Sequence, residues 1–130
     1  EEKSPEGAVA FAEHWLAVFQ EAENSGEVED LKSLSTNKCG SCKNFVDAIQ
    51  EVYAAGGSMR SEGWRVLTVG EPAAAEKGYS IPLQVEQSDQ TVVEKAGAEP
   101  QLNEGISIGL AAQVIWTSSA WQMNRLDIVQ

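Results

Sequence analysis

The sequence predicts an α+β fold in which three N-terminal helices pack on a curved antiparallel sheet. Apolar residues recur at three- and four-residue spacing in the first half of the chain and at two-residue spacing from about residue 64. Helices followed by a run of strands are typical of α+β domains. With 130 residues, of which 42% are apolar and 22% charged, the chain can bury a core of its own. We therefore expect one domain over residues 1–130, with 1–4 as the end of a linker.

The first helix is expected to begin at Ser4-Pro5 and to end at Asn24-Ser25-Gly26. Serine caps free N–H groups, proline presets φ for the first turn, and glycine ends helices in the left-handed conformation. Glu23 is expected on the polar side of this helix. The apolar side consists of Ala8, Phe11, Ala12, Trp15, Val18, Phe19 and Ala22.

Two further helices are expected before the strands. A short one carries Val28, Leu31 and Leu34 on one side. The third follows the cysteine pair and is closed by Gly56-Gly57. Its apolar positions are Phe45, Val46, Ile49, Val52 and Tyr53.

The second half is expected to form an antiparallel meander. The expected strands cover residues 64–69, 79–86, 91–93, 106–117 and 121–129, with a polar loop over 97–105. Pro82 lacks a backbone N–H, so its strand is expected to be an edge strand or to carry a bulge there.

Cys39 and Cys42 are the only cysteines, and their CxxC spacing leaves three interpretations open. On the first turn of a helix the pair is close enough for a disulfide, which would form readily in an exported protein. A redox dithiol is the second interpretation, because a helix N-terminus lowers the pKa of a thiol and so favours the reactive thiolate. A zinc site needs four ligands, and the pair with the single His14 supplies three.

We favour the structural disulfide. A thioredoxin-like motif follows a β-strand within a βαβ unit, whereas the segment before Cys39 is helical and the chain ends in strands. We expect no metal and no cofactor.

The net charge of −11 opposes binding to nucleic acid, which is recognised largely through Lys and Arg. No apolar stretch is long enough to cross a bilayer. The chain opens on Glu1-Glu2-Lys3-Ser4-Pro5, without an initiator Met. We therefore expect that an upstream segment was removed, with a signal peptide or lipid anchor as the obvious candidate.

Seven residues are candidates for lining a pocket: His14, Trp15, Tyr53, Trp64, Trp116, Arg125 and Asp127. His14 is a candidate because histidine is the usual acid or base near neutral pH, but it is expected at the boundary of the first helix. Arg125 and Asp127 share a strand face with Met123, and we expect that face to point outward because Leu126 and Ile128, on the other face, are better core residues. The aromatic residues serve equally well as core.

The segment Glu6–Trp15, the turn Ser25-Gly26-Glu27, the Cys39–Cys42 pair and the segment Tyr53–Gly57 together resemble an uncharacterised family of actinobacterial lipoproteins. The resemblance covers residues 4–70 in pattern and the rest in strand layout. It implies an extracytoplasmic, lipid-anchored protein at the cell surface.

The order of elements also resembles the cone-shaped, cystatin-like fold of the nuclear-transport-factor-two and polyketide-cyclase-like superfamily. That resemblance implies isomerases, dehydratases, cyclases or plain binding modules. Isomerase-type members place an Asp or His with a Tyr deep in the cone. His14, Asp127 and Tyr53 do not match that pattern.

We therefore expect a non-catalytic binding or interaction domain of an exported, lipid-anchored cell-surface protein. Its partner would be a small apolar ligand or a protein, and the chain would be a monomer or homodimer that meets the membrane only through the removed anchor. The alternative is an isomerase or cyclase that uses an ionisable group in the cone.

Overall fold

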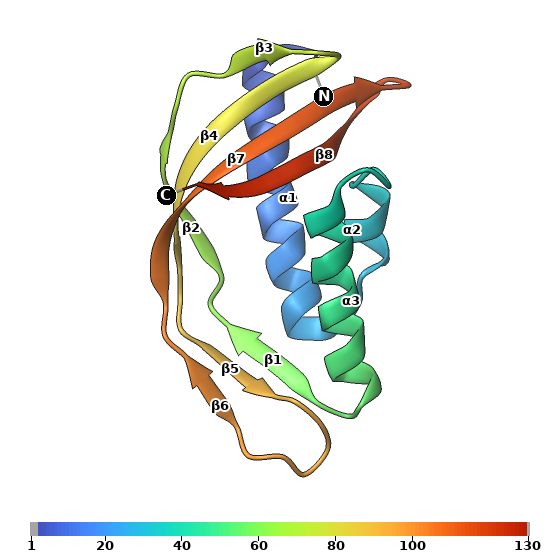
Figure 1. Cartoon of the computed structure of the whole chain (residues 1–130), viewed down its shortest axis with the longest axis vertical. Helices are drawn as coiled ribbons and strands as arrows, with labels where there is room; N and C mark the ends of the chain where they lie inside the picture. The colour runs from blue at the N-terminus through green and yellow to red at the C-terminus, as the bar shows by residue number, and fades with distance from the viewer. Residues whose placement is uncertain (1–2, 130) are drawn as a thin grey trace.

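The computed structural model describes residues 3–129, and this part of the chain forms three helices followed by eight strands (Figure 1). The helices are α1 (Pro5–Ser25), α2 (Glu29–Ser33) and α3 (Gly40–Ala54). The strands are β1 (Ser58–Ser61), β2 (Trp64–Val69), β3 (Ala73–Ala75), β4 (Gly78–Gln87), β5 (Gln90–Val93), β6 (Gln101–Asn103), β7 (Ile106–Thr117) and β8 (Ala120–Val129). The predicted α+β class is confirmed.

The strands form two antiparallel sheets that continue into each other. The larger sheet has the order β2-β4-β7-β8, with β3 also paired to β4, and the smaller one has the order β1-β5-β6. β4 pairs with β7 along its whole length, and the same two stretches of chain run on as β5 and β6, which pair with each other. Figure 1 shows the two parts meeting at an angle, so together they make one bent surface.

Gly105 allows the close approach of the two chain stretches at this bend. A Cβ atom on Gly105 would lie 2.2 Å from the carbonyl oxygen of Gln87, which no side chain can do. The Gly105 N–H also donates to the Asp89 carboxylate at 2.7 Å. The close approach of the backbone therefore requires a glycine here, at the end of the segment predicted to be a polar loop.

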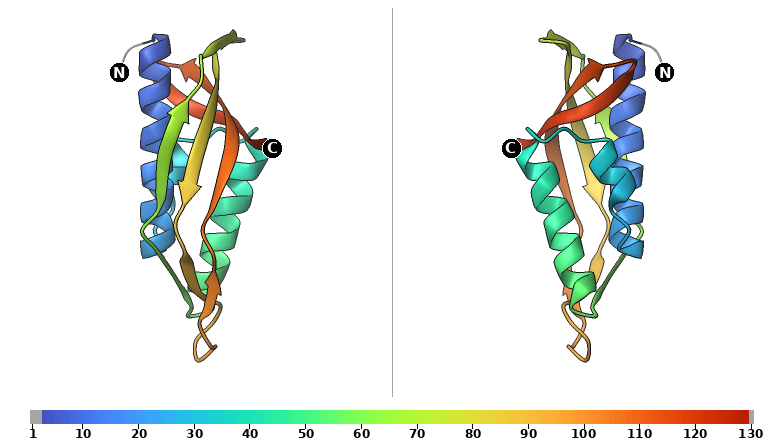
Figure 2. Two further views of the ribbon diagram at one scale, coloured as in Figure 1. Left: turned by 90° about the vertical axis from the view of Figure 1, so that its left-hand side faces the viewer. Right: turned by 90° about the vertical axis from the view of Figure 1, so that its right-hand side faces the viewer.

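The helices cover the concave side of the bent sheet, as both views in Figure 2 show. Trp15 of α1 and Trp121 of β8 are among the largest fully buried side chains, and Leu31 anchors the short helix α2. Each such side chain stabilises the fold by roughly 1.5–3 kcal/mol. Within residues 3–129 no helix combines the length and apolarity needed to span a membrane.

The two ends of α1 follow the sequence signals. The Ser4 hydroxyl accepts a hydrogen bond from the Gly7 N–H at 3.0 Å, and Pro5 occupies the first helical position. At the other end Gly26 adopts φ +81° and its N–H donates to Ala22 at 2.8 Å. The predicted boundaries of this helix are confirmed.

The prediction for Pro82 is wrong, because β4 is an interior strand without a bulge at that residue. On one side β4 pairs with β7, and on the other its neighbour changes from β2 to β3 next to Pro82. The Pro82 carbonyl points into that interruption and accepts from the Gly70 N–H at 2.8 Å. The missing proline N–H therefore faces a gap in the ladder. The irregularity in this pairing lies in β2, between Val66 and Thr68.

Three short strands were not predicted. β1 and β3 are short and weakly patterned, and β6 lies inside the expected loop 97–105. α3 begins at Gly40, so the cysteine pair lies at its first turn, as the disulfide interpretation requires. Whether such short segments form strands depends on pairing with a neighbouring strand, and the local sequence does not encode that pairing.

Gly26 provides a test of the packing between α1 and α3. A Cβ atom there would meet the ring of Tyr53 at 2.7 Å, whereas Gly97 has the same φ of +81° and no atom within 4 Å of its Cβ position. We expect Gly97→Ala to lower the free energy of unfolding by about 1 kcal/mol, for left-handed strain alone. Gly26→Ala should lower it by a further 1–3 kcal/mol, roughly, because of the overpacking.

Urea unfolding of both variants and the unsubstituted chain measures these differences. Equal losses in the two variants would contradict the Tyr53 contact.

Candidate functional site

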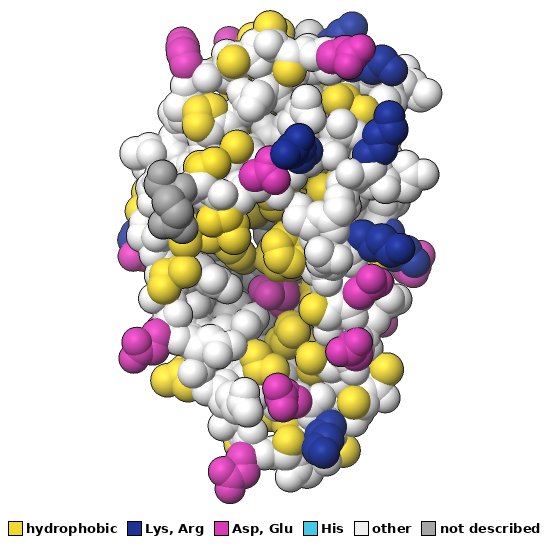
Figure 3. Space-filling model, viewed as in Figure 1, with side chains coloured by type: hydrophobic (Ala, Val, Ile, Leu, Met, Phe, Trp, Pro, Cys, Tyr) yellow, Lys and Arg dark blue, Asp and Glu magenta, His cyan; other side chains and the backbone are white. Residues whose placement is uncertain are grey.

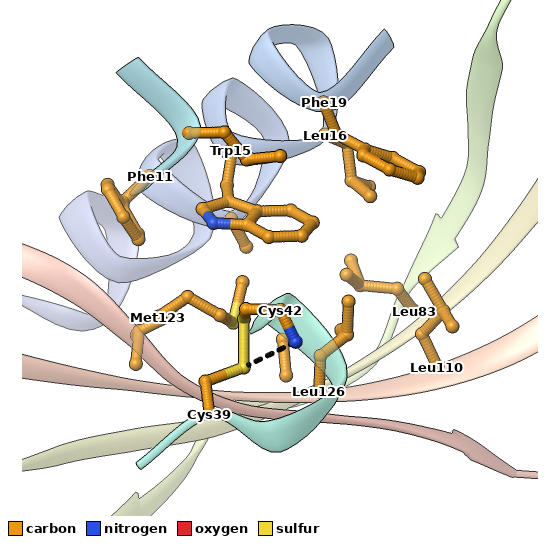
Figure 4. Close-up of a cluster of buried hydrophobic side chains, with 14 of the residues drawn as sticks. Phe11, Trp15, Leu16, Phe19, Cys39, Cys42, Leu83, Leu110, Met123 and Leu126 are labelled. Carbon is orange, nitrogen blue, oxygen red and sulfur yellow. Dashed lines mark hydrogen bonds between the residues drawn. A yellow bond between two sulfur atoms is a disulfide. The ribbon is translucent and has the colours of Figure 1, made fainter. Parts of the chain in front are cut away.

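Cys39 and Cys42 form a disulfide at the start of α3, with Cα atoms 5.2 Å apart. Each cysteine is 1% exposed, and the bond lies in the core beside Trp15, Met123 and Leu126 (Figure 4). The Cys39 sulfur also accepts a hydrogen bond from the Cys42 N–H at 3.2 Å, so it caps the helix. The disulfide and this cap together stabilise the first turn of α3.

The disulfide holds Ser41 against the outer edge of β8. The Ser41 hydroxyl donates to the Leu126 carbonyl at 2.6 Å. Further along the same edge, Met123 donates to the Leu34 carbonyl at 2.8 Å and accepts from the Thr36 N–H at 2.9 Å. The start of α3 and the segment before it therefore cover this edge from Met123 to Leu126.

An apolar cleft of about 340 Å³ opens next to this contact, between the sheet and helices α1 and α3. Figure 3 shows hydrophobic side chains gathered along this hollow. Of the described residues that line it, Asp127 is the one charged residue. The lining residues are Trp15, Leu16, Phe19, Ser41, Asn44, Phe45, Trp64, Ile108, Leu110, Leu126, Asp127 and Ile128.

Aromatic rings form one wall of the cleft. The Phe19 ring lies 4.8 Å from the Phe45 ring and 5.8 Å from the Trp64 ring, centroid to centroid. Trp15 stacks on Phe19 at 5.7 Å, and its indole N–H donates to the Ser35 hydroxyl at 3.0 Å. This wall comes from α1, α3 and β2 together, so it exists only in the folded chain.

Three of the seven predicted pocket residues, Trp15, Trp64 and Asp127, line the cleft. Tyr53 has a structural role: its hydroxyl donates to the Glu23 carbonyl at 2.6 Å and accepts from the Met59 N–H at 3.2 Å. Trp116 packs edge-on against Trp121 at 5.1 Å and lies outside the cleft.

His14 does not line the cleft, contrary to its place among the pocket candidates. Its side chain is exposed, while the next residue, Trp15, is fully buried. One residue turns an α-helix by about 100°, which carries the imidazole out of the apolar stripe.

Arg125 and Asp127 face outward and form an ion pair at 2.8 Å on the exposed side of β8. Simple alternation placed Met123 on the same face as Arg125 and Asp127, and this prediction is wrong. The register of β7 and β8 shifts next to Val114, and Met123 is buried. Ile128 was expected in the core but is 62% exposed. Its side chain lies at the rim of the cleft, which the helices leave open.

The apolar cleft residues themselves were not predicted as a site. Phe45, Ile108, Leu110 and Leu126 all fit the periodicity of a helix or strand that faces the core. Nothing in the sequence distinguishes a core residue that meets a partner side chain from one that borders a cleft.

Glu23 was expected on the polar side of α1 and is buried. It faces the smaller sheet, where one carboxylate oxygen accepts from the Gln90 amide at 3.1 Å and the other has no hydrogen-bond partner among the described residues. Burial raises the pKa of Glu23, and the hydrogen bond from Gln90 partly opposes the rise. Glu23 lies outside the cleft, so its role is structural.

A second, polar cleft of about 790 Å³ lies at the bend between the two sheets. Trp64 lines both clefts and separates them. Among the described residues its buried indole N–H has no hydrogen-bond partner. Glu62, Glu86 and Asp89 line the polar cleft with one basic residue, Arg65, which pairs with Glu86. Residues 3–129 contain no group of three or more His, Cys, Asp or Glu side chains that could hold a metal ion.

Solved structures share this architecture. The intermembrane-space region of the chloroplast protein ARC6 is similar over 99% of this chain and 98% of that one, with 11% identity and a TM-score of 0.71. Aln2 from a Streptomyces species is similar over 100% and 94%, with 11% identity and a TM-score of 0.56. An NTF2-like protein from Anabaena variabilis covers 100% and 95%, with 8% identity and a TM-score of 0.46. At these identities the first two likenesses show the fold alone.

A family model described as "Family of unknown function (DUF6318)" matches residues 1–127. No match is found among the curated proteins.

Glu23→Gln tests the buried carboxyl. Because the pKa of Glu23 is raised in the folded state, the unsubstituted chain loses stability as the pH rises from about 4.5 through the folded-state value. We expect Glu23→Gln to abolish this loss. The variant should be more stable by about 1 kcal/mol at pH 7.5, and the gain should vanish near pH 4.

Urea unfolding at several pH values measures this difference, with Glu21→Gln as the control at an exposed position of the same helix. A stability gain that does not grow with pH would contradict the assignment.

Proposed function

We propose that this chain, which belongs to a family of unknown function (DUF6318), is a non-catalytic binding domain whose apolar cleft holds an apolar group. The observation that carries the proposal is the composition of the cleft: of its twelve lining residues, nine are apolar and one is charged. Ligand sites are typically concave, mostly apolar and supplied with a few polar groups. Ser41, Asn44 and Asp127 are the polar groups here.

Ile128 adds weight to the proposal. It is a large aliphatic side chain at the rim of the cleft with 62% of its surface exposed. Exposed apolar surface next to an apolar cleft is typical of an interaction site. A bound group would remove the exposed side chain and the cleft lining from water together.

The enzymatic alternative is an isomerase or cyclase, which needs an ionisable group sunk in an apolar cavity. Asp127 is the ionisable residue among those that line the cleft, and its carboxylate lies at the surface in an ion pair with Arg125. A proton carrier held in solvent by a cation is poorly placed for that chemistry. The geometry therefore favours binding.

The disulfide favours a structural role over a redox one. Thiol-disulfide exchange requires a thiolate to reach one of the sulfurs, and both cysteines are 1% exposed. Closing this small loop stabilises the chain by about 2 kcal/mol on the chain-entropy treatment.

We further propose that the protein is exported and lipid-anchored at the cell surface. Disulfides persist in oxidising compartments, and the sequence pattern resembles that of surface lipoproteins. Trapping free thiols in intact cells, followed by mass measurement of the protein, tests this. A bonded Cys39–Cys42 pair in the envelope fraction is expected, and reduced cysteines in the cytosolic fraction would contradict it.

An uncharged apolar fluorophore, N-phenyl-1-naphthylamine, tests the cleft, and its lack of charge avoids repulsion by a chain of charge −11. We expect its fluorescence to rise on binding and Ile128→Ser to weaken binding about fivefold, since the change removes about 1 kcal/mol of apolar contact. Leu102→Ser is the matched control, because Leu102 is 63% exposed and lies on β6, away from the cleft.

Equal effects of the two substitutions would place the fluorophore elsewhere. Absence of any binding by the unsubstituted chain would overturn the proposed function.

A further inference from the structure

β8 is an end strand of the larger sheet, and its outer edge is hydrogen-bonded along only part of its length. The Leu126 carbonyl points away from β7, because it accepts from Ser41 of α3. In an antiparallel pair the main-chain groups of alternate residues point to the same side. The N–H and C=O groups of Ile128 therefore also point away from β7.

The outward groups of Ile128 have no hydrogen-bond partner among the described residues. The contacts along this edge, from Leu34, Thr36 and Ser41, reach Met123 and Leu126 and stop there. Unpaired main-chain groups at a sheet edge are a template for another strand.

The free edge borders the apolar cleft. The Ile128 side chain lines the cleft, with Asn44 and Phe45 of α3 among the other lining residues. The cleft volume of about 340 Å³ is at the lower end of ligand pockets, roughly 300–1,000 Å³. A main chain on the edge could thus place one large side chain into the cleft.

Charge favours a basic occupant. Asp127 at the apolar cleft is already paired with Arg125, so it adds no net charge there. The acidic excess comes from the polar cleft, where Glu62, Glu86 and Asp89 outnumber Arg65. The whole chain carries −11. Opposite potentials across an interface speed association and exclude wrong partners.

We propose that the occupant is an extended segment of a partner protein, which adds as a strand to β8 at Ile128, inserts one aliphatic side chain into the cleft and carries basic residues on either side. This inference rests on the proposed function and names the partner class for the same cleft. Main-chain hydrogen bonds supply affinity in this mode of recognition, and the pocket for the side chain supplies specificity.

The probe is a seven-residue peptide with blocked ends and a central leucine, flanked by alternating threonine and lysine. We expect it to displace N-phenyl-1-naphthylamine and to slow hydrogen exchange of the Ile128 amide. Two further peptides carry N-methyl groups on the odd-numbered or on the even-numbered residues. Only one of these two sets of amides faces β8, so one peptide should lose binding and the other should keep it. Replacing the lysines by glutamate should weaken binding at least tenfold.

Ile128→Pro and Ile128→Ala form a matched pair of variants. Both lose the isoleucine side chain, but only proline loses the outward N–H, and an edge strand tolerates proline there. We expect the two variants to bind the fluorophore equally, and the proline variant to bind the peptide about tenfold more weakly. Urea unfolding verifies that both are folded.

The outcomes separate the two proposals. If the fluorophore binds and the peptide does not displace it, the strand addition is wrong and the apolar binding role stands. If the peptide binds but the two N-methylated peptides bind equally well, the occupant does not pair with β8. If the fluorophore itself fails to bind, the proposed function is wrong.

Discussion

The position of α3 relative to the sheet is the constraint on which the cleft depends. At its start, the Cys39–Cys42 disulfide fixes a turn from which Ser41 donates to β8 at 2.6 Å. At its other end, the Tyr53 hydroxyl binds the Glu23 carbonyl at 2.6 Å and so ties α3 to α1. Between these two anchors Phe45 packs against Phe19, and both residues line the cleft together with Leu126 and Ile128 of β8.

The sequence was sufficient for the class of the fold and for most of its long elements. Strong periodicity and clear capping residues such as Ser4 and Gly26 made α1 predictable almost to the residue. What failed depended on neighbours far away in the chain. Pro82 is tolerated in an interior strand because the adjacent strand changes there, and Met123 is buried because a register shift interrupts alternation. Neither event has a local sequence signal.

The site was predicted less well, for a related reason. Trp15, Trp64 and Asp127 were anticipated, but the apolar residues that complete the cleft look like ordinary core residues in the sequence. Among the titratable residues, His14 is exposed, in keeping with its expected place at the boundary of the first helix, whereas Glu23, expected on the polar side, is buried. The fold shared with ARC6 and Aln2 does not decide between binding and catalysis, because function depends on the site and not on the architecture.

The disulfide and the contact from Ser41 together hold open the apolar cleft between α3 and the sheet. Methyl NMR under xenon pressure tests it most directly, because xenon enters apolar cavities. We expect the methyl resonances of Ile108, Leu110 and Ile128 to shift in the oxidised protein and to shift much less in a folded Cys39→Ala/Cys42→Ala variant. Unchanged resonances in the oxidised protein, or equal shifts in both proteins, would contradict it.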